Sequence, residues 1–346
     1  MVAVEARAAV LALNSGSSSL KYGLYTVAAE PVLLVGGTIE TAEDRGVDHA
    51  RFFDTIETAL RAWPTPTVIG HRIVHGGPHR DAHCRIDAAV MADLEAACAL
   101  APLHGPASLA LIRAAEIRYP GVPQVACFDT AFHAGMPDVA KTLPIPREYR
   151  ANGVRRYGFH GLSCESIVNQ LGEAMPPRLV IAHLGNGASV TAVRDGRSID
   201  TSMGLTPSGG VMMATRTGDL DPGILLYLLR EAGLDQDSLA TLVDHASGMA
   251  GVSGLSGDMR VLRAAATDDA DLAIRMFERS VCKQIAAMIV SLGGVDTLVL
   301  TGGIGENDAA TGRTIRAGLD WVAGLDIRIM PSQEDAQIAS HAAALG

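Results

Sequence analysis

The sequence predicts an α/β protein of two domains that repeat one plan, with a ligand held between the two copies. Its 346 residues are enough for two domains that each bury a core of their own. Each half begins with an apolar strand, a turn of small residues and two further strands, at 9–39 and again at 178–201. Strands and helices alternate after both openings, as is typical of α/β folds.

The first half is expected to open as an antiparallel meander. The patterns predict strands at 9–13, 20–25, 31–39, 67–74 and 122–128, and helices at 87–100 and 108–118. Tyr119-Pro120-Gly121 should end the second helix, because proline and glycine do not continue one. The stretch 142–152, with two prolines and mixed charge, is the expected boundary between the domains.

Two hairpins are predicted to open the second half. Asn186-Gly187 and Asp195-Gly196 are dipeptides that strongly favour tight β-turns. The predicted strands are 178–184, 188–194, 197–201 and 295–300, and the predicted helices are 219–232 and 275–292. The last strand runs into the glycine-rich stretch 301–307, and a strand, a glycine turn and a helix start suit the phosphates of a nucleotide.

Composition argues against several classes of protein. A net charge of −10 and the lack of Lys/Arg runs argue against a nucleic-acid surface. The five cysteines are odd in number and form no CxxC pair, which favours a reduced compartment. No apolar stretch reaches the length of a membrane span, and Met1–Val10 makes a poor signal peptide. We therefore expect a soluble, cytoplasmic protein without a membrane partner.

The stretch Asn14-Ser15-Gly16-Ser17-Ser18-Ser19-Leu20-Lys21 follows the first predicted strand. A turn lined by hydroxyls and amides, with one cation at its rim, suits phosphate oxygens and their Mg²⁺. The alternative interpretation is a serine-rich hairpin turn without a ligand. A Walker A loop is excluded, because the GxxxxGK[ST] pattern is absent and no helix pattern follows.

Charged side chains recur in or beside the other glycine-rich loops of this acidic chain: Arg72, His104, His160, His183, Arg216, Asp258 and Arg260. Asp129 lies at the carboxyl end of the strand predicted at 122–128, where open α/β sheets bind ligands. Each has a structural alternative: a surface arginine, a hydrogen-bonded histidine or a helix N-cap aspartate. Together they favour phosphoryl transfer, which requires positioned charges more than covalent chemistry.

Several segments, in order along nearly the whole chain, resemble the acetate kinase family of acetate and propionate kinases. They are NSGSSSLK (14–21), GHRIVHGG (70–77), APLHGP (101–106), FDTAFH (128–133), RRYGFHGLS (155–163), HLGNGAS (183–189), DTSMGLTPSGGVMMATRTGDLDP (200–222), SGDMR (256–260) and TGGIGEN (301–307). The family belongs to the superfamily of sugar kinases, Hsp70 and actin. The resemblance implies two duplicated actin-like ATPase domains of the ribonuclease H-like fold, with an active-site cleft between them.

The resemblance also implies a reaction: ATP and acetate give ADP and acetyl phosphate, reversibly, by direct in-line transfer with Mg²⁺ or Mn²⁺. By this resemblance the catalytic residues are Asp129, His160, Arg216 and His104. The acetate contacts are Arg72, for the carboxylate, and an apolar pocket of Val74, Leu103, Phe159 and Pro207. The nucleotide contacts are Ser17, Ser19, Lys21, His183, Leu184, Gly185, Asn186, Gly187, Asp258, Met259, Arg260, Gly303, Ile304, Gly305, Glu306 and Asn307, and the metal residues are Asn14 and Glu334.

Elementary chemistry agrees with these roles. A carboxylate that attacks phosphorus is already ionised at neutral pH, so Asp129 is expected to organise its neighbours and not to act as an obligate base. An apolar pocket separates acetate from propionate by only about 1–3 kcal/mol per methylene. A propionate or butyrate kinase therefore stays an alternative, as does an ATPase of the actin or Hsp70 type.

The chain departs from the family near its C-terminus. It is short before Gly70 and between Asn307 and Glu334, and the motif reads PSQEDAQIA, so Asp335 could replace Glu334 at the metal. By the resemblance, the N-terminal domain is expected at 1–146, completed by a helix at 333–346. The C-terminal domain, at 147–332, is expected to bind the nucleotide and to carry a homodimer interface.

Overall fold

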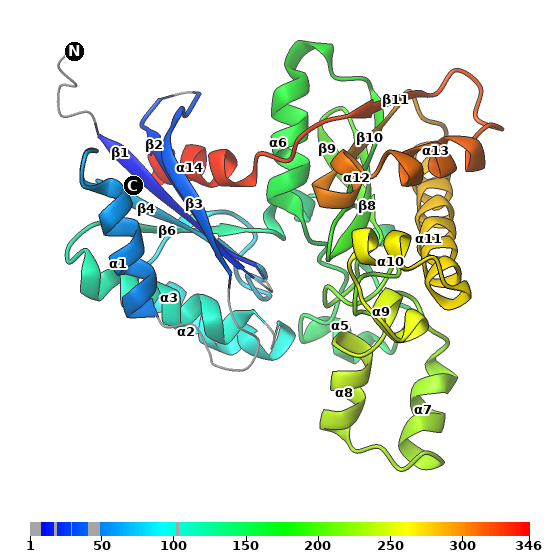
Figure 1. Cartoon of the computed structure of the whole chain (residues 1–346). Helices are drawn as coiled ribbons and strands as arrows, with labels where there is room; N and C mark the ends of the chain where they lie inside the picture. The colour runs from blue at the N-terminus through cyan, green and yellow to red at the C-terminus, as the bar shows by residue number, and fades with distance from the viewer. Residues whose placement is uncertain (1–7, 17–18, 29, 41–48, 102–103) are drawn as a thin grey trace. The chain divides into compact units, whose positions relative to one another are not determined.

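The computed structural model describes residues 8–16, 19–28, 30–40, 49–101 and 104–346. The chain divides into two compact units (Figure 1). The first consists of Met1–Ala134, His160–Ser166 and Gln333–Gly346, and the second of Gly135–Phe159 and Ile167–Ser332. Each unit contains one mixed β-sheet with helices packed on it.

The sheet of the first unit begins with the predicted meander. Its strands are β1 (Ala9–Ser15), β2 (Ser19–Thr26), β3 (Leu33–Glu40), β4 (Val68–Ile73), β5 (Cys84–Arg85) and β6 (Gln124–Phe128), in the order β3-β2-β1-β4-β6-β5. The first three strands pair antiparallel, whereas β1, β4 and β6 run parallel. Asn14 and Lys21, at the two ends of the serine-rich stretch, are paired across β1 and β2.

Helices cover both faces of this sheet. They are α1 (His49–Leu60), α2 (Ala88–Ala97), α3 (Gly105–Arg118) and α14 (Glu334–Leu345). Leu11 and Leu13 of β1 belong to one apolar core with residues of α1 and α3, while Val10 and Ala12 belong to another core with α14. Alternate residues of a strand point to opposite faces, so this pattern assigns each β1 side chain to one of the two helix layers.

The sheet of the second unit repeats the topology of the first. Its strands are β7 (Arg178–Leu184), β8 (Ala188–Arg194), β9 (Arg197–Thr201), β10 (Thr297–Thr301) and β11 (Asp326–Ile329). Their order, read from β9, is β9-β8-β7-β10-β11, which matches β3-β2-β1-β4-β6. The antiparallel and parallel pairings match as well. The predicted duplication of one plan is confirmed at the level of topology.

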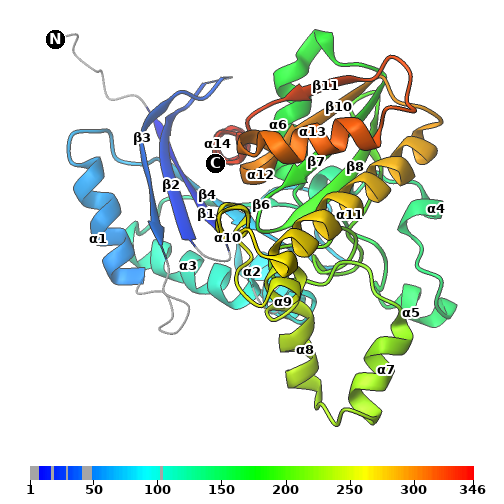
Figure 2. The same cartoon turned by 45° about the vertical axis from the view of Figure 1, so that its right-hand side comes forward.

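Further helices lie in the second unit, and α6 begins in the first and continues into the second. They are α4 (Asp138–Lys141), α5 (Arg147–Ala151), α6 (Gly161–Leu171), α7 (Pro222–Arg230), α8 (Gln236–Asp244), α9 (Gly248–Ser253), α10 (Met259–Ala265), α11 (Asp268–Leu292), α12 (Gly302–Asn307) and α13 (Ala309–Gly318). The long helix α11 packs along β8 (Figure 2). Among the described residues, none of the helices is both long and apolar enough to cross a bilayer.

Two predicted helix boundaries were wrong. The helix expected at 219–232 spans only Pro222–Arg230, because Asp221 caps it and proline starts it. The helix expected at 275–292 already begins at Asp268, where the Thr267 side chain accepts a hydrogen bond from the backbone N–H of Ala270. Its three aspartates near the N-terminus favour this earlier start through the helix dipole.

Candidate active site

Three polar side chains meet at the carboxyl ends of the parallel strands of the first unit. Asn14 lies on β1, Arg72 on β4, and Asp129 directly follows β6. Each continues the side-chain alternation that faces α14, as the preceding apolar residues Val10, Ala12, Val68, Val125 and Cys127 show. Because the three strands run in one direction, their ends place these side chains together.

Arg72 and Asp129 form a buried ion pair. The Arg72 Nη2 atom lies 2.6 Å from Asp129 Oδ2, and Arg72 Nε donates to both carboxylate oxygens at 3.1 and 3.2 Å. Burial disfavours the Arg72 cation, but the carboxylates of Asp129 and Glu334 outweigh this and raise its pKa. Burial raises the pKa of Asp129, and the facing guanidinium limits the rise.

Asn14 joins this pair to the start of α14. Its Oδ1 accepts from Arg72 Nη1 at 3.3 Å, and its Nδ2 donates to Asp335 Oδ1 at 2.8 Å and to Glu334 Oε2 at 3.2 Å. The structure therefore brings both candidate acidic residues to Asn14. Burial raises the pKa of Asp335, and the nearby Glu334 carboxylate raises it further, whereas Lys21 and Arg72 act in the opposite direction.

The residues around Asn14 fit a hard divalent cation. Glu334 and Asp335 offer carboxylate oxygens, which are the ligands that Mg²⁺ and Mn²⁺ prefer. Two neighbouring carboxylates, one of them held by burial above its usual pKa, would be stabilised by a cation. The Asn14 amide donates through its nitrogen to both carboxylates and so orients them.

His160 is linked to Asp129 through the backbone. The N–H of Gly161 donates to the Asp129 carbonyl at 2.9 Å, and His160 adopts the left-handed conformation with φ 58°. A side chain at position 161 would overlap the Asp129 carbonyl, so only glycine allows this close approach. The buried His160 side chain therefore follows a chain path that is fixed directly against the Asp129 backbone.

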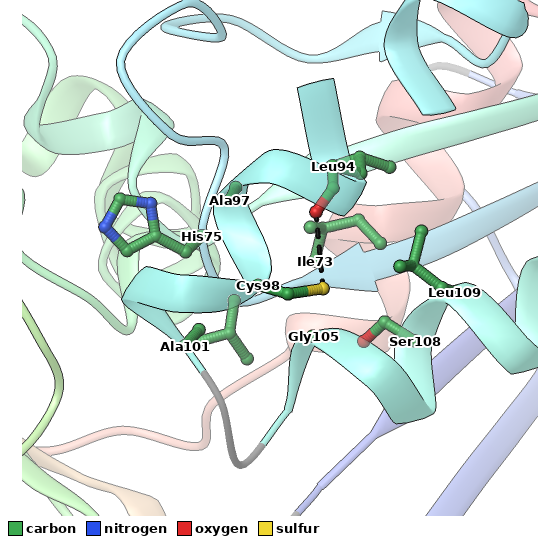
Figure 3. A pocket seen from close by; sticks show the side chains of 10 residues that line it. Ile73, His75, Leu94, Ala97, Cys98, Ala101, Gly105, Ser108 and Leu109 are labelled. Atoms are coloured by element: carbon green, nitrogen blue, oxygen red, sulfur yellow. Dashed lines mark hydrogen bonds between the residues drawn. The ribbon is translucent and has the colours of Figure 1, made fainter. Parts of the chain in front are cut away.

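The predicted apolar contacts fall in both units. Val74 is buried in the first unit, and Phe159 and Pro207 are buried in the second. A small, mainly apolar pocket adjoins Val74 (Figure 3), lined by Ile73, Val74, His75, Leu94, Ala97, Cys98, Ala101, Gly105, Ser108 and Leu109. His104 lies just before α3. Two of the predicted site residues, Ser17 and Leu103, lie outside the described residues.

Two glycine-rich segments of the second unit meet at the ends of β7 and β10. His183 and Thr301 are register partners in these parallel strands, so the turn 184–187 and α12 start side by side. A side chain at Gly302 would come within 2.8 Å of the Leu184 carbonyl. This close backbone approach needs glycine, and it aligns the two segments predicted to hold the phosphates.

Several predicted nucleotide residues have protein partners in this structure. The Glu306 carboxylate accepts from the backbone N–H groups of Gly302 at 2.9 Å and Ser332 at 3.0 Å, and Asn307 Nδ2 donates to the Gly303 carbonyl. Asp258 caps α10 and pairs with the exposed Arg260, Nη2 to Oδ2, at 2.6 Å. These hydrogen bonds hold the backbone of the segments at 258–260 and 301–307 in its conformation.

One partly buried network in the second unit carries no sequence motif. Arg263 of α10 donates through Nε and Nη2 to the Asp308 carboxylate, at 2.7 to 3.1 Å, and its Nη2 lies 3.0 Å from Glu278 Oε1. Thr311 joins the same carboxylates. Arg263 follows the predicted nucleotide-binding segment 258–260, and Asp308 directly follows the segment 301–307, so their ion pair ties the two segments together. Arg263 belongs to no recognisable sequence motif, so the sequence did not predict this contact.

The sequence matches the model of the Acetokinase family over residues 47–335. The chain is 44% identical over 337 residues to an acetate kinase from Deinococcus deserti, and the similar region covers 89% of this chain and 83% of that protein. It is 40% identical over 344 residues to an acetate kinase from Rhodopseudomonas palustris, covering 90% and 86% of the two chains.

Solved structures are similar over nearly the whole chain. Acetate kinase from Porphyromonas gingivalis has a TM-score of 0.85 at 31% identity and covers 98% of this chain and 99% of its own. A propionate kinase from Francisella tularensis has a TM-score of 0.87 at 32% identity and covers 98% and 100%. A putative N-acetylmannosamine kinase from Listeria monocytogenes, with a TM-score of 0.50 at 11% identity and 97% of each chain covered, shares the fold alone. The chain belongs to the acetokinase family.

Proposed function

We propose that the protein is an acetate kinase, which transfers the γ-phosphoryl group of ATP reversibly to acetate. The observation that carries this proposal is the buried cluster of Asn14, Arg72 and Asp129 beside the acidic start of α14, in a chain that is 44% identical to an acetate kinase. The cluster offers a cation for a small carboxylate and oxygen ligands for a divalent metal.

Arg72 is proposed to hold the acetate carboxylate. The Arg72 guanidinium donates to Asp129 through Nε and Nη2 and to Asn14 through Nη1. Nη1 and Nη2 each carry a second N–H, and these two donors suit the two oxygens of a carboxylate. Asp129 fixes the orientation of the Arg72 guanidinium and balances its charge. The cation is therefore already in position before acetate binds.

The reaction then needs no general base. An acetate oxygen forms a bond to the γ-phosphorus while the bond to the bridging oxygen breaks, and ADP leaves with that electron pair. Arg216 and His160 are proposed to stabilise the charge on the transferring group, and the Arg216 Nη1 atom is held by a hydrogen bond to the Pro207 carbonyl at 3.2 Å. Glu334 and Asp335, which Asn14 orients, would hold Mg²⁺, and the ion would neutralise phosphate charge.

The nucleotide is proposed to bind at the second unit. The turn 184–187 and the start of α12 lie side by side, and glycine-rich turns at helix starts suit phosphate groups. Asp258 caps the neighbouring α10, which begins with Met259 and Arg260 and is tied to Asp308 by Arg263. On this proposal, the first unit supplies the carboxylate and metal contacts.

A direct assay tests the function. Purified protein with Mg·ATP is given acetate, propionate or butyrate, and the acyl phosphate is trapped with hydroxylamine. We expect the highest kcat/KM with acetate. A higher value with propionate would instead favour the activity of the Francisella tularensis relative, and ATP hydrolysis without any acyl phosphate would favour an ATPase of the actin or Hsp70 type.

We also infer that the protein is a cytoplasmic homodimer that associates through the second unit. Helix α7 buries none of its own residues and exposes Ile224, Leu226 and Tyr227. Apolar side chains clustered on one exposed helix are typical of an interface. Light scattering should give twice the chain mass, and Leu226→Asp should give the single mass.

A further inference from the structure

Three ionisable side chains that no motif marked meet in the first unit. His83 precedes β5, Glu165 lies on α6, and His341 lies on α14. The Glu165 Oε2 atom is 2.9 Å from His341 Nε2 and 3.6 Å from His83 Nε2. The two imidazole rings lie close together, with 3.8 Å between their centroids and their planes tilted by 38°. We name these residues the His-Glu-His cluster.

Two histidines and a carboxylate could hold a metal ion, but the hydrogen bonds argue for another role. The backbone N–H of Phe128 donates to His83 Nδ1 at 3.0 Å. The proton of the neutral ring must then reside on Nε2, the nitrogen that faces Glu165, and a protonated nitrogen has no lone pair for a metal. Glu165 is therefore the acceptor in a hydrogen-bonded cluster.

The charge state of Glu165 agrees with this role. Burial raises the pKa of its carboxyl, but the imidazoles of His341 and His83 outweigh burial and lower the pKa to about 2. The carboxylate is thus ionised at neutral pH, and it accepts a hydrogen bond from His341 Nε2 at 2.9 Å, while His83 Nε2 lies 3.6 Å away. Hydrogen bonds to an ionised acceptor are stronger than neutral ones.

The cluster joins the two helices that carry parts of the proposed active site. Helix α6 begins directly after His160, and α14 begins with Glu334 and Asp335. A second link joins the same two helices at the start of α14, where the N–H of Gln333 donates to Ser166 Oγ at 3.2 Å. His341 follows Glu334 by two helical turns and so lies on the same side of α14.

Apolar packing alone does not fix the rotation of α14 about its axis or its position along the sheet. The helix packs through Ile338 and Ala342 onto β4, where Gly70 lets it approach closely. Contacts among small apolar groups are non-directional and would permit the helix to slide or rotate slightly. A short charge-assisted hydrogen bond has a defined direction and length, so it can set the rotation of the helix.

We propose that Glu165 is a positioning residue, which holds α14 through His341 so that Glu334 and Asp335 stay against Asn14. The inference rests on the proposed function in one respect: it takes these two carboxylates to serve the divalent cation. Glu165 acts on the acidic pair through His341, which lies two helical turns after Glu334 on α14.

The test is Glu165→Gln, which keeps the shape and removes the charge. Binding of Mn²⁺ is titrated by the loss of the free-ion EPR signal, and amide exchange of the segment 333–346 is followed by mass spectrometry. We expect the Kd for Mn²⁺ to rise roughly tenfold, as for other residues that orient metal ligands. Exchange in 333–346 should quicken, and high Mg²⁺ should restore most of kcat.

Asp93→Asn is the matched control. It breaks the Arg80–Asp93 ion pair of 2.7 Å, whose side chains are 26% and 29% exposed, close to the 24% of Glu165. This pair lies in the same unit but not on α14, so Mn²⁺ binding should stay as in the wild type. Should Glu165→Gln not fold, His341→Gln weakens the same contact, and the same two measurements apply.

Two results would overturn the proposal. One is a Glu165→Gln protein that is less stable, like the control, but binds Mn²⁺ and exchanges 333–346 as the wild type does. The other is one equivalent of zinc in the purified protein that His83→Ala removes, since zinc requires the His83 Nε2 atom to be unprotonated. A wild type that forms no acyl phosphate would reject the function, while the Mn²⁺ and exchange data would still test Glu165.

Discussion

The guanidinium of Arg72 and the carboxylate of Asp129 form a two-point ion pair at the ends of two neighbouring parallel strands, with 2.6 Å between Nη2 and Oδ2. The Asp129 side chain is only 1% exposed, and that of Arg72 is 13% exposed. Two residues that the sequence suggested for separate tasks, substrate anchoring and catalysis, are therefore one structural unit. A change in either must alter the other.

Removing one partner of this pair should destabilise the protein strongly. Arg72→Met leaves a buried carboxylate without its cation, which typically costs about 3–5 kcal/mol. The double variant Arg72→Met/Asp129→Leu removes both charges and should regain most of that stability without regaining activity. Urea unfolding of the three proteins measures this. Equal stability of Arg72→Met and the wild type would contradict the importance of the pair.

Arg72 and Arg216 should differ in their kinetic effects. Arg72→Ala is expected to raise the KM for acetate far more than the KM for ATP, since it removes the carboxylate anchor. Arg216→Ala should mainly lower kcat, on the order of 10³-fold if it stabilises the transferring phosphoryl group. Steady-state kinetics with both substrates varied separates the two.

Arg113→Ala serves as the control for these arginine variants. It breaks an ion pair with Glu95 whose side chains are more than half exposed. Such surface pairs contribute little, so its kinetics should match the wild type. An Arg72→Ala enzyme with equal changes in both KM values would speak against the anchoring role.

The Arg263 network should govern nucleotide affinity. Arg263→Met frees α10 from Asp308 and leaves the buried Glu278 without its cationic partner, so the two nucleotide segments are no longer tied together. We expect a several-fold higher Kd for ATP by calorimetry, with the KM for acetate unchanged. Arg275→Ala, which breaks an exposed pair with Asp271 on α11, should leave the Kd as it is.

His71 should make the protein less stable in mild acid. Its Nε2 atom lies 2.7 Å from Gln124 Oε1, and its buried Nδ1 has no hydrogen-bond partner among the described residues. Burial lowers its pKa from 6.5 to about 4, although Gln124 acts in the opposite direction. Charging the folded ring would leave a buried N–H unsatisfied.

The sign follows from the two pKa values. Above pH 6.5 the ring is neutral in both states and contributes nothing; between 6.5 and about 4 only the unfolded chain takes up the proton, so stability falls as pH falls. The loss reaches about 3 kcal/mol below pH 4. Urea unfolding across this range should show a flatter pH dependence for His71→Leu, and an unchanged slope would contradict the assignment.

Local chemistry explains which elements could be predicted from the sequence. The strands at 178–184, 188–194 and 197–201 were predicted to the residue, because Asn186-Gly187 and Asp195-Gly196 fix their turns locally. The serine-rich stretch was predicted as one loop, yet β1 continues through Ser15 and β2 begins at Ser19. Ladder hydrogen bonds with neighbouring strands extend both strands beyond their local pattern.

The sequence by itself determined the duplicated α/β plan, the family and the residue types of the candidate site, since these depend on composition, alternation and motifs. Only the tertiary structure decided that Asn14 meets Asp335, which is 321 residues away, and that Glu165 meets His341. It also decided that the carboxylates of Glu306 and Asp258 accept hydrogen bonds from backbone N–H groups. Such contacts depend on the order of the strands and on the position and rotation of the helices. These features result from many interactions between distant residues, so no single stretch of sequence predicts them.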